Sequence, residues 1–200
     1  MSTQVDFYLS PISPWTFLGI SRFRKLVARY DAAANYKPVH LGRIFETVNV
    51  APVTKRPEAM QKHRLDELRR WRDFLEIPIN LHPRHFPTDP TPACRLIAAA
   101  VLEGGDVAEL CEACMAACWI HEEDIADRGT LIRVADRCGF DGTSLIEAAN
   151  RAEALVLVDA NTDEAIARSV IGTPTFVIGQ EVLFGQDRLD FVERELQGAS

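Results

Sequence analysis

The sequence predicts an α/β fold in which one domain is interrupted by a large, all-helical insertion. Strand-forming runs lie only near the two ends of the 200-residue chain, while residues 57–161 carry helical periodicity broken by proline and glycine. Sheet and helices must each bury an apolar face, so we expect the two parts to meet at a cleft. The predicted division is one domain of residues 1–50 and 162–200 and an insertion of residues 51–161.

The N-terminal segment predicts a β-α-β unit. The apolar run Val5–Leu9 is too short for a helix and is halted at Ser10-Pro11, so it indicates a buried strand. Residues 14–30 repeat apolar side chains at helical spacing, and Pro14 suits a first helical turn. Residues 36–41 supply a second strand, and strands joined by such a crossover are normally parallel.

The middle of the chain has almost no strand signal. Residues 83–92 are rich in proline and predict an irregular connection. Around it we expect helices over residues 60–75, 91–103, 106–121, 130–138, 143–154 and 161–169.

β character returns near the C-terminus. Residues 175–178 and 182–184 are short apolar runs separated by Gly179-Gln180-Glu181, a pattern that predicts a hairpin. Residues 187–197 then place large apolar side chains at helical spacing and predict a closing helix.

Composition and charge narrow the classes of function. A chain with 47% hydrophobic and 26% charged residues is typical of a folded protein. The formal net charge of -7 argues against a nucleic-acid partner, because phosphate binding requires clustered Lys and Arg. The chain has no apolar run of about 18 residues and no signal-peptide pattern, so we expect a cytoplasmic protein that does not enter a membrane.

The cysteines are expected to be free thiols, because their number is odd and disulfides rarely persist in the cytoplasm. Cys111, Cys114, Cys118 and His121 share one helical face, a spacing that suits metal ligands, a redox pair or core packing. We favour core packing, because cysteine behaves as a small buried hydrophobe and one straight helix cannot surround an ion tetrahedrally.

Several motifs in a fixed order resemble a known family. In DsbA-type thioredoxin folds the first strand leads into Cys-Pro-x-Cys, and a cis Thr-Pro bond precedes a hairpin; here the corresponding segments are Ser10-Pro11-Ile12-Ser13 and Gly172-Thr173-Pro174-Thr175. The other matching segments are Asn49 with Pro52, Leu68-Arg69-Arg70-Trp71 before Ile77-Pro78, and Phe184-Gly185-Gln186-Asp187-Arg188-Leu189. Together they resemble the 2-hydroxychromene-2-carboxylate isomerases of bacterial aromatic catabolism and the kappa-class glutathione transferases. The resemblance implies a thioredoxin-like domain of DsbA/kappa type with a helical insertion, glutathione as cofactor and a homodimer.

The resemblance also implies that a serine activates the glutathione thiol. A thiol with a pKa of about 8.5 is only a few per cent ionised at pH 7, so its anion must be stabilised. A hydroxyl between a strand and a helix donates a hydrogen bond to the thiolate, and the N–H groups and dipole of the helix add positive potential. The alternative is that Ser10 or Ser13 is only an N-cap. We assign the catalytic role to Ser10 and the cap to Ser13, which is adjacent to Pro14.

Further contacts to glutathione follow from the same resemblance. The backbone of Thr173, beside a cis Pro174, pairs with the cysteine of glutathione as an added strand does, although a strand-edge proline is the alternative. Phe184, Gly185, Gln186 and Asp187 hold the γ-glutamyl end, with Asp187 on its ammonium and Gln186 on its carboxylate. Asp187 also suits the start of the closing helix.

The glycyl carboxylate of glutathione requires a cation. The loop from Asn49 to Pro57 offers Asn49, Thr54 and Lys55, with Arg56 and Lys62 as competing candidates and a solvated charge run as the other interpretation. For the second substrate we name Arg43 and His85, because a cation, an imidazole and the adjacent Phe86 ring suit an anionic aromatic molecule. His85 is otherwise a surface histidine.

The function implied is a glutathione-dependent isomerase of an unsaturated aromatic carboxylate such as 2-hydroxychromene-2-carboxylate. The thiolate adds to the substrate, permits ring opening and bond rotation, and leaves, so that glutathione is regenerated. The alternatives are a kappa-type transferase or peroxidase, which consumes the thiol, and a non-catalytic thioredoxin-fold module that binds peptides along the edge at Pro174.

Overall fold

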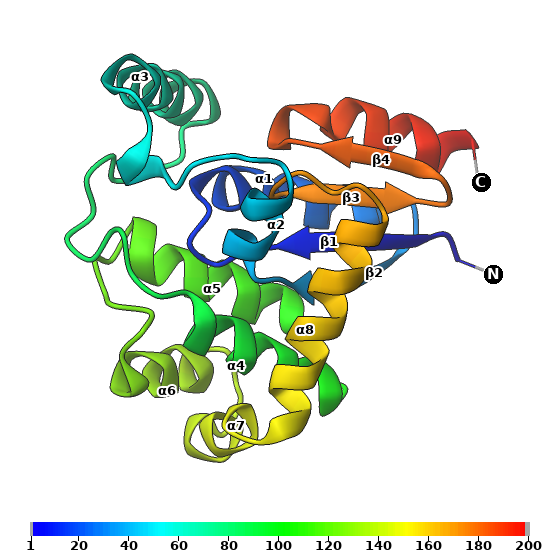
Figure 1. Ribbon diagram of the computed structural model, residues 1–200. Helices are drawn as coiled ribbons and strands as arrows, with labels where there is room; N and C mark the ends of the chain where they lie inside the picture. The colour runs from blue at the N-terminus through cyan, green and yellow to red at the C-terminus, as the bar shows by residue number, and fades with distance from the viewer. Residues whose placement is uncertain (1, 199–200) are drawn as a thin grey trace.

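A four-stranded mixed sheet forms the centre of the fold (Figure 1). The computed structural model describes residues 2–198. Strands β1 (Gln4–Leu9), β2 (Ala33–Pro38), β3 (Thr175–Ile178) and β4 (Glu181–Phe184) lie in the order β2-β1-β3-β4. Strand β1 is parallel to β2 and antiparallel to β3, and β3 pairs antiparallel with β4. The predicted parallel β-α-β unit and the predicted hairpin are therefore confirmed.

The side chains of β1 alternate between two apolar clusters. Val5, Phe7 and Leu9 are fully buried in the main core, which they share with helix α1 (Pro14–Arg29). Tyr8 points to the other face and joins Val177 in a smaller cluster. Because neighbouring strand residues face opposite sides of a sheet, β1 requires helices on both of its faces.

The remaining helices surround the sheet. Figure 1 shows α4 to α7 gathered below it, α3 standing apart at the upper left, and α9 above β4. Their bounds are α2 (Leu41–Thr47), α3 (Glu58–Leu75), α4 (Thr91–Leu102), α5 (Val107–Trp119), α6 (Arg128–Arg137), α7 (Gly142–Ala149), α8 (Ala152–Ala167) and α9 (Leu189–Gly198), with short 3-10 turns η1 (Val53–Lys55) and η2 (Gln186–Arg188). Within residues 2–198, no helix has the length and apolar character that crossing a membrane requires.

Aspartate caps explain why the helices of the insertion begin where they do. Asp106, Asp127 and Asp141 each accept a hydrogen bond from a backbone N–H in the first turn of α5, α6 and α7. Such caps satisfy N–H groups that have no partner within the helix. The predicted helices over 106–121 and 130–138 are confirmed to within a few residues.

Several predicted boundaries are wrong. Strand β2 ends at Pro38 rather than Leu41, and α2, which follows it, was not predicted. The helices expected over 143–154 and 161–169 are instead α7 and a long, uninterrupted α8. The polar residues in the middle of α8 made one helix look like two in the sequence. One of them, Thr162, is fully buried: it donates to the Val158 carbonyl at 2.7 Å and accepts the His40 N–H at 2.9 Å. The predicted domain border at residue 161 falls inside α8, and the division into two domains stays a prediction.

The aromatic cluster between α1 and the sheet provides a test of the fold. The Phe23 ring lies 4.7 Å from that of Phe7 and 4.8 Å from that of Phe176, between ring centres, and the side chain is fully buried. We expect Phe23→Ala to lower the free energy of unfolding by about 3–5 kcal/mol, because it removes apolar burial and leaves a cavity. Phe191→Ala, at a ring that is 47% exposed, should change it by less than about 1 kcal/mol. Urea denaturation measures both, and equal losses would contradict the core assignment.

Candidate active site

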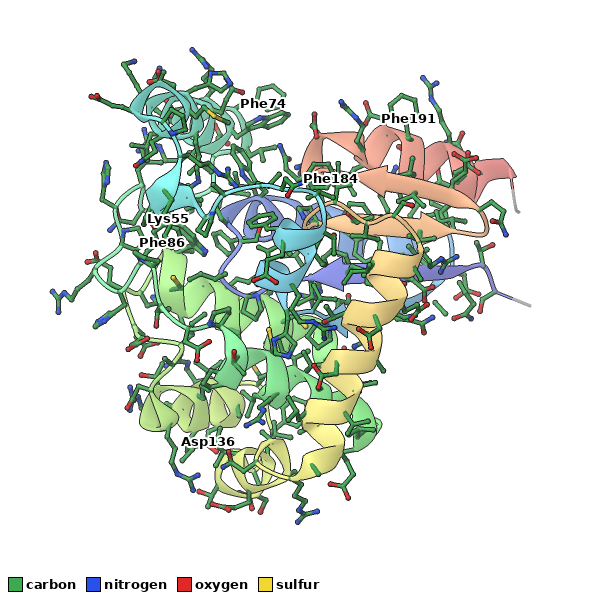
Figure 2. The ribbon with its side chains drawn as sticks, viewed as in Figure 1. Lys55, Phe74, Phe86, Asp136, Phe184 and Phe191 are labelled. Atoms are coloured by element: carbon green, nitrogen blue, oxygen red, sulfur yellow. The ribbon has the colours of Figure 1, made fainter. Side chains whose placement is uncertain are left out.

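A large cavity lies where the start of α1 meets the segment before β3. It has a volume of about 670 Å³, within the range typical of small-molecule sites, and its walls are mostly apolar. Aromatic rings from four separate segments line it: Trp15, Phe45, Phe86 and Phe184. Figure 2 shows Phe86 at the left of this region and Phe184 on β4, toward its upper right.

Ser13 is the hydroxyl-bearing residue that lines the cavity at the start of α1. Ser13 lines the cavity and is the N-cap of α1, where its Oγ accepts the Thr16 N–H at 3.2 Å. The same oxygen donates to the Thr173 carbonyl at 3.1 Å, next to the Thr173–Pro174 bond, which is cis as predicted. Residues 160 positions apart in the chain are thereby joined at one atom. The predicted cap at Ser13 is confirmed.

Ser10 does not face the cavity. Its side chain is fully buried, it lines neither of the hollows described here, and its Oγ has no hydrogen-bond partner among the described residues. The backbone carbonyl of Ser10 accepts the Ser13 N–H at 3.0 Å, closing a turn in which Pro11 takes the second position. Because of this turn, α1 begins at Pro14, and Ser13 rather than Ser10 stands at its N-terminus. The expectation that the Ser10 hydroxyl stands opposite the cis proline is therefore not met.

A second, smaller hollow of about 360 Å³ adjoins the first and shares Trp15, Thr173 and Phe184 with it. Pro174, Gly185, Gln186 and Asp187 also line it, so the structure brings the predicted γ-glutamyl segment together with Thr173. Gly185 has φ +113°, and a side chain on it would collide with the Asp187 carboxylate. Only glycine therefore lets that carboxylate fold back beside the hollow.

Gln186 is held in place by Arg22. Arg22 of α1 donates to the Gln186 side-chain Oε1 and, at 3.1 Å, to its carbonyl, and the guanidinium lies 5.9 Å from the centre of the Trp71 ring. Burial lowers the pKa of Arg22. Gly19 permits this approach, because a Cβ there would lie 2.9 Å from that of Gln186. The side-chain oxygen of Gln186 is thus engaged within the protein, and its amide nitrogen is the group left for a ligand.

The residues of the loop before α3 that were predicted to bind the glycyl carboxylate differ in whether they reach the large cavity. Thr54 and Arg56 line the large cavity, whereas Asn49 and Lys55 are exposed and do not. Figure 2 shows Lys55 below α3 and just above the label of Phe86 in this view. Lys62 forms an ion pair with Asp66 at 2.8 Å. Of the competing candidates for a glycyl carboxylate, the structure brings only Arg56 and Thr54 to the cavity wall.

Neither residue predicted for the second substrate lines the cavity. Arg43 forms ion pairs with Asp159 at 3.2 Å and Asp163 at 2.6 Å, which hold its guanidinium on α8. His85 Nδ1 lies 4.0 Å from a carboxylate oxygen of Asp124. Arg64 of α3 lines the cavity instead. The sequence motifs did not indicate this residue, because an arginine within a charged helix carries no signal of its own. For Ser13 a signal exists: Ser13-Pro14-Trp15-Thr16 repeats the Ser-Pro spacing that drew attention to Ser10.

The cysteines lie away from both hollows and pack in the core, as predicted. Cys111 and Cys114 are fully buried and Cys118 is nearly so. Burial raises the pKa of Cys94 and of Cys118 to about 12 and raises those of Cys111 and Cys114 as well. A thiol held neutral in this way is a poor nucleophile.

A strand, a turn and a helix that begins after a serine, facing a cis-proline backbone beside a hairpin, define a thioredoxin-fold protein with Ser13 at the start of its first helix. The family model of the DSBA-like thioredoxin domain matches residues 4–197. The chain belongs to this family.

Two kinds of relative agree with that assignment. The chain is 26% identical to 2-hydroxychromene-2-carboxylate isomerases from Pseudomonas sp. (strain C18) and from Sphingobium xenophagum, over 98% of its own length and 91% and 99% of theirs. The solved structure of a 2-hydroxychromene-2-carboxylate isomerase superposes with a TM-score of 0.82 at 25% identity, covering 98% of this chain and 95% of that one. A probable DsbA oxidoreductase from Streptomyces coelicolor shares the fold, with a TM-score of 0.80 at 18% identity over 98% and 89% of the two chains. The resemblance to DsbA-type folds and to 2-hydroxychromene-2-carboxylate isomerases, inferred from the motifs, is confirmed.

Thiol accessibility tests the placement of the cysteines. We expect the native protein at pH 8 to react with Ellman's reagent at no more than one thiol, that of the partly exposed Cys138, and the unfolded protein to react at all 5. The reason is that burial both hides the other sulfurs and raises their pKa. Rapid labelling of a second thiol in the native protein, followed by absorbance at 412 nm, would contradict the core assignment.

Proposed function

We propose that the protein is a glutathione-dependent isomerase of unsaturated aromatic carboxylates, with 2-hydroxychromene-2-carboxylate as the representative substrate. The observation that carries the proposal is the Ser13 hydroxyl, which lines an aromatic cavity and bridges the start of α1 to the backbone beside the cis proline. Similarity to isomerases of this name over nearly the full length supports the same reaction.

The residues around the two hollows fit a tripeptide thiol. A hydroxyl and a helix N-terminus meet at Ser13, the Thr173 backbone lies across from them, a carboxylate is present at Asp187, and a guanidinium is present at Arg56. The Thr173 Oγ1 is buried without a hydrogen-bond partner among residues 2–198, so a polar ligand group has an atom to satisfy there. We therefore assign the γ-glutamyl end to the smaller hollow and the glycyl end to Arg56 and Thr54.

Glutathione, when bound, supplies the sulfur nucleophile for this chemistry. The task of the chain is to favour the ionised thiol and to hold an aromatic substrate beside it. The Ser13 hydroxyl donates to the Thr173 carbonyl, and rotation of its hydrogen would redirect it to an anion in the cavity, while Oγ continues to accept the Thr16 N–H. The N–H groups and dipole of α1 add positive potential at the same place. The apolar walls exclude water and strengthen both effects. The expected cytoplasmic location and dimer stay predictions.

Substitution of Ser13 tests the assignment of the hydroxyl. We expect Ser13→Ala to lower kcat/KM by about 100-fold, the usual effect of removing one donor to a developing or fixed anion. The bound thiol, followed by thiolate absorbance near 240 nm, should ionise at a pH higher by about one unit or more. Since activity requires the thiolate, the acidic limb of the pH profile should move upward with it.

Two further variants separate catalysis from structure. Ser13→Ala is expected to lower the stability of α1 by about 1 kcal/mol, whereas Ser13→Gly keeps most of the stability that the cap provides. Both variants should lose activity to the same extent. Ser10→Ala should keep activity within about threefold, because the Ser10 Oγ has no partner among the described residues. A loss of activity in Ser10→Ala equal to that in Ser13→Ala would return the catalytic role to Ser10.

Two other observations would indicate the alternative functions. Consumption of free thiol during turnover would indicate a transferase or peroxidase. Affinity for extended peptides without affinity for glutathione would indicate a binding module.

Asp187 provides a second, independent test of glutathione binding. We expect Asp187→Asn to raise the Kd for glutathione about three- to fivefold, the size typical of a charge pair at an exposed carboxylate. Asp190→Asn is the matched control, since Asp190 is also exposed and near but does not line the hollow. Isothermal titration calorimetry measures both, and an unchanged Kd in Asp187→Asn would remove Asp187 from the site.

A further inference from the structure

The large cavity carries positive charge without a counter-charge. Arg56 and Arg64 both line it, and none of the described residues in its wall is an aspartate or glutamate. Buried or half-buried charges in proteins are normally paired, because removing a charge from water is costly. The cavity is therefore suited to an anion, even though the chain as a whole has a formal net charge of -7.

Arg64 is the more enclosed of the two. Its Nη2 is buried and has no hydrogen-bond partner within residues 2–198, whereas Arg56 already donates from Nε to the Ala51 carbonyl at 2.8 Å. Neighbouring cations of α3 behave differently: Lys62 pairs with Asp66, and Arg72 with Asp73, each at 2.8 Å. Burial, with a smaller contribution from the charge of Arg56, lowers the pKa of Arg64 to about 10, so the group still carries its proton at neutral pH.

An aromatic wall stands directly beside this guanidinium. The Arg64 Cζ lies 5.2 Å from the centre of the Phe86 ring, which also lines the cavity. Contact with the ring restrains the guanidinium, and a restrained guanidinium is suited to carboxylate recognition through its N–H donors. The free donor and the ring together fit a flat ligand whose carboxylate is attached to an aromatic system.

We propose that Arg64 binds the carboxylate of the aromatic substrate and thereby selects acids over neutral molecules of the same shape, leaving Arg56 for the glycyl carboxylate of the cofactor. The identity of the substrate rests on the proposed function, but the anion site does not. Arg64 is a substrate-binding residue in this assignment, and Ser13 remains the group that acts on the reacting sulfur.

The test measures binding without glutathione. Coumarin-3-carboxylate serves as a non-reactive aromatic acid, coumarin-3-carboxamide as its neutral counterpart, and calorimetry gives both Kd values. We expect Arg64→Gln to weaken binding of the acid about 10- to 100-fold, the range for a hydrogen bond to a charged group, and binding of the amide less than threefold. Arg64→Lys should retain part of the affinity. Arg69→Gln, at an exposed arginine of α3 that does not line the cavity, should leave both affinities unchanged.

Each other outcome is decisive. Equal weakening of acid and amide means that Arg64 only packs on Phe86, and absence of acid binding by the unaltered protein means that the anion site does not exist; either overturns the inference. A loss of glutathione affinity in Arg64→Gln with acid binding intact means that Arg64 serves the glycyl carboxylate, which also overturns it. Acid binding that depends on Arg64, together with no turnover of 2-hydroxychromene-2-carboxylate, would support the inference while contradicting the proposed function. Thermal unfolding of each variant confirms that it is folded.

Discussion

The hydrogen bond between Ser13 and Thr173 forms the junction where the two hollows meet. The Ser13 hydroxyl accepts the Thr16 N–H within α1 and donates to the Thr173 carbonyl, so it ties the first helix to the backbone that leads into β3. The large cavity and the smaller hollow meet at this junction, because Trp15 and Thr173 belong to both walls. A hydroxyl, a helix N-terminus and the backbone beside the cis proline therefore share one small volume, in which the helix supplies positive potential.

The sheet determines that this junction can form. Residues of β1 alternate between two apolar clusters, which requires helices on both faces. Antiparallel pairing places the end of β1 beside the start of β3. The turn closed by the Ser10 carbonyl and the Ser13 N–H then sets where α1 begins. Apolar burial thus supplies the rigidity, and a few hydrogen bonds select which polar atoms face the cavity.

Local charge in the site differs from the charge of the whole chain. The protein is acidic overall, yet two arginines and a helix N-terminus line the large cavity. Arg43, which motif analysis assigned to the substrate, is instead held by Asp159 and Asp163 on α8. Ion pairs with acidic residues distant in the sequence thus decide which arginines remain available for a ligand. Arg64 remains available because its described surroundings contain no carboxylate partner.

The sequence alone determined the elements that local chemistry controls: the β-α-β start, the capped helices, the hairpin, the cis Thr173–Pro174 bond and the segments that border the site. It also determined the family, because motifs in a fixed order are specific even when each alone is not. Only the tertiary structure decided which of two hydroxyls, Ser10 or Ser13, enters the cavity, and which arginines stay unpaired. The physical reason is that both outcomes depend on contacts between residues more than a hundred positions apart, such as Ser13 with Thr173 and Arg43 with Asp163, whereas periodicity and spacing report only on neighbours.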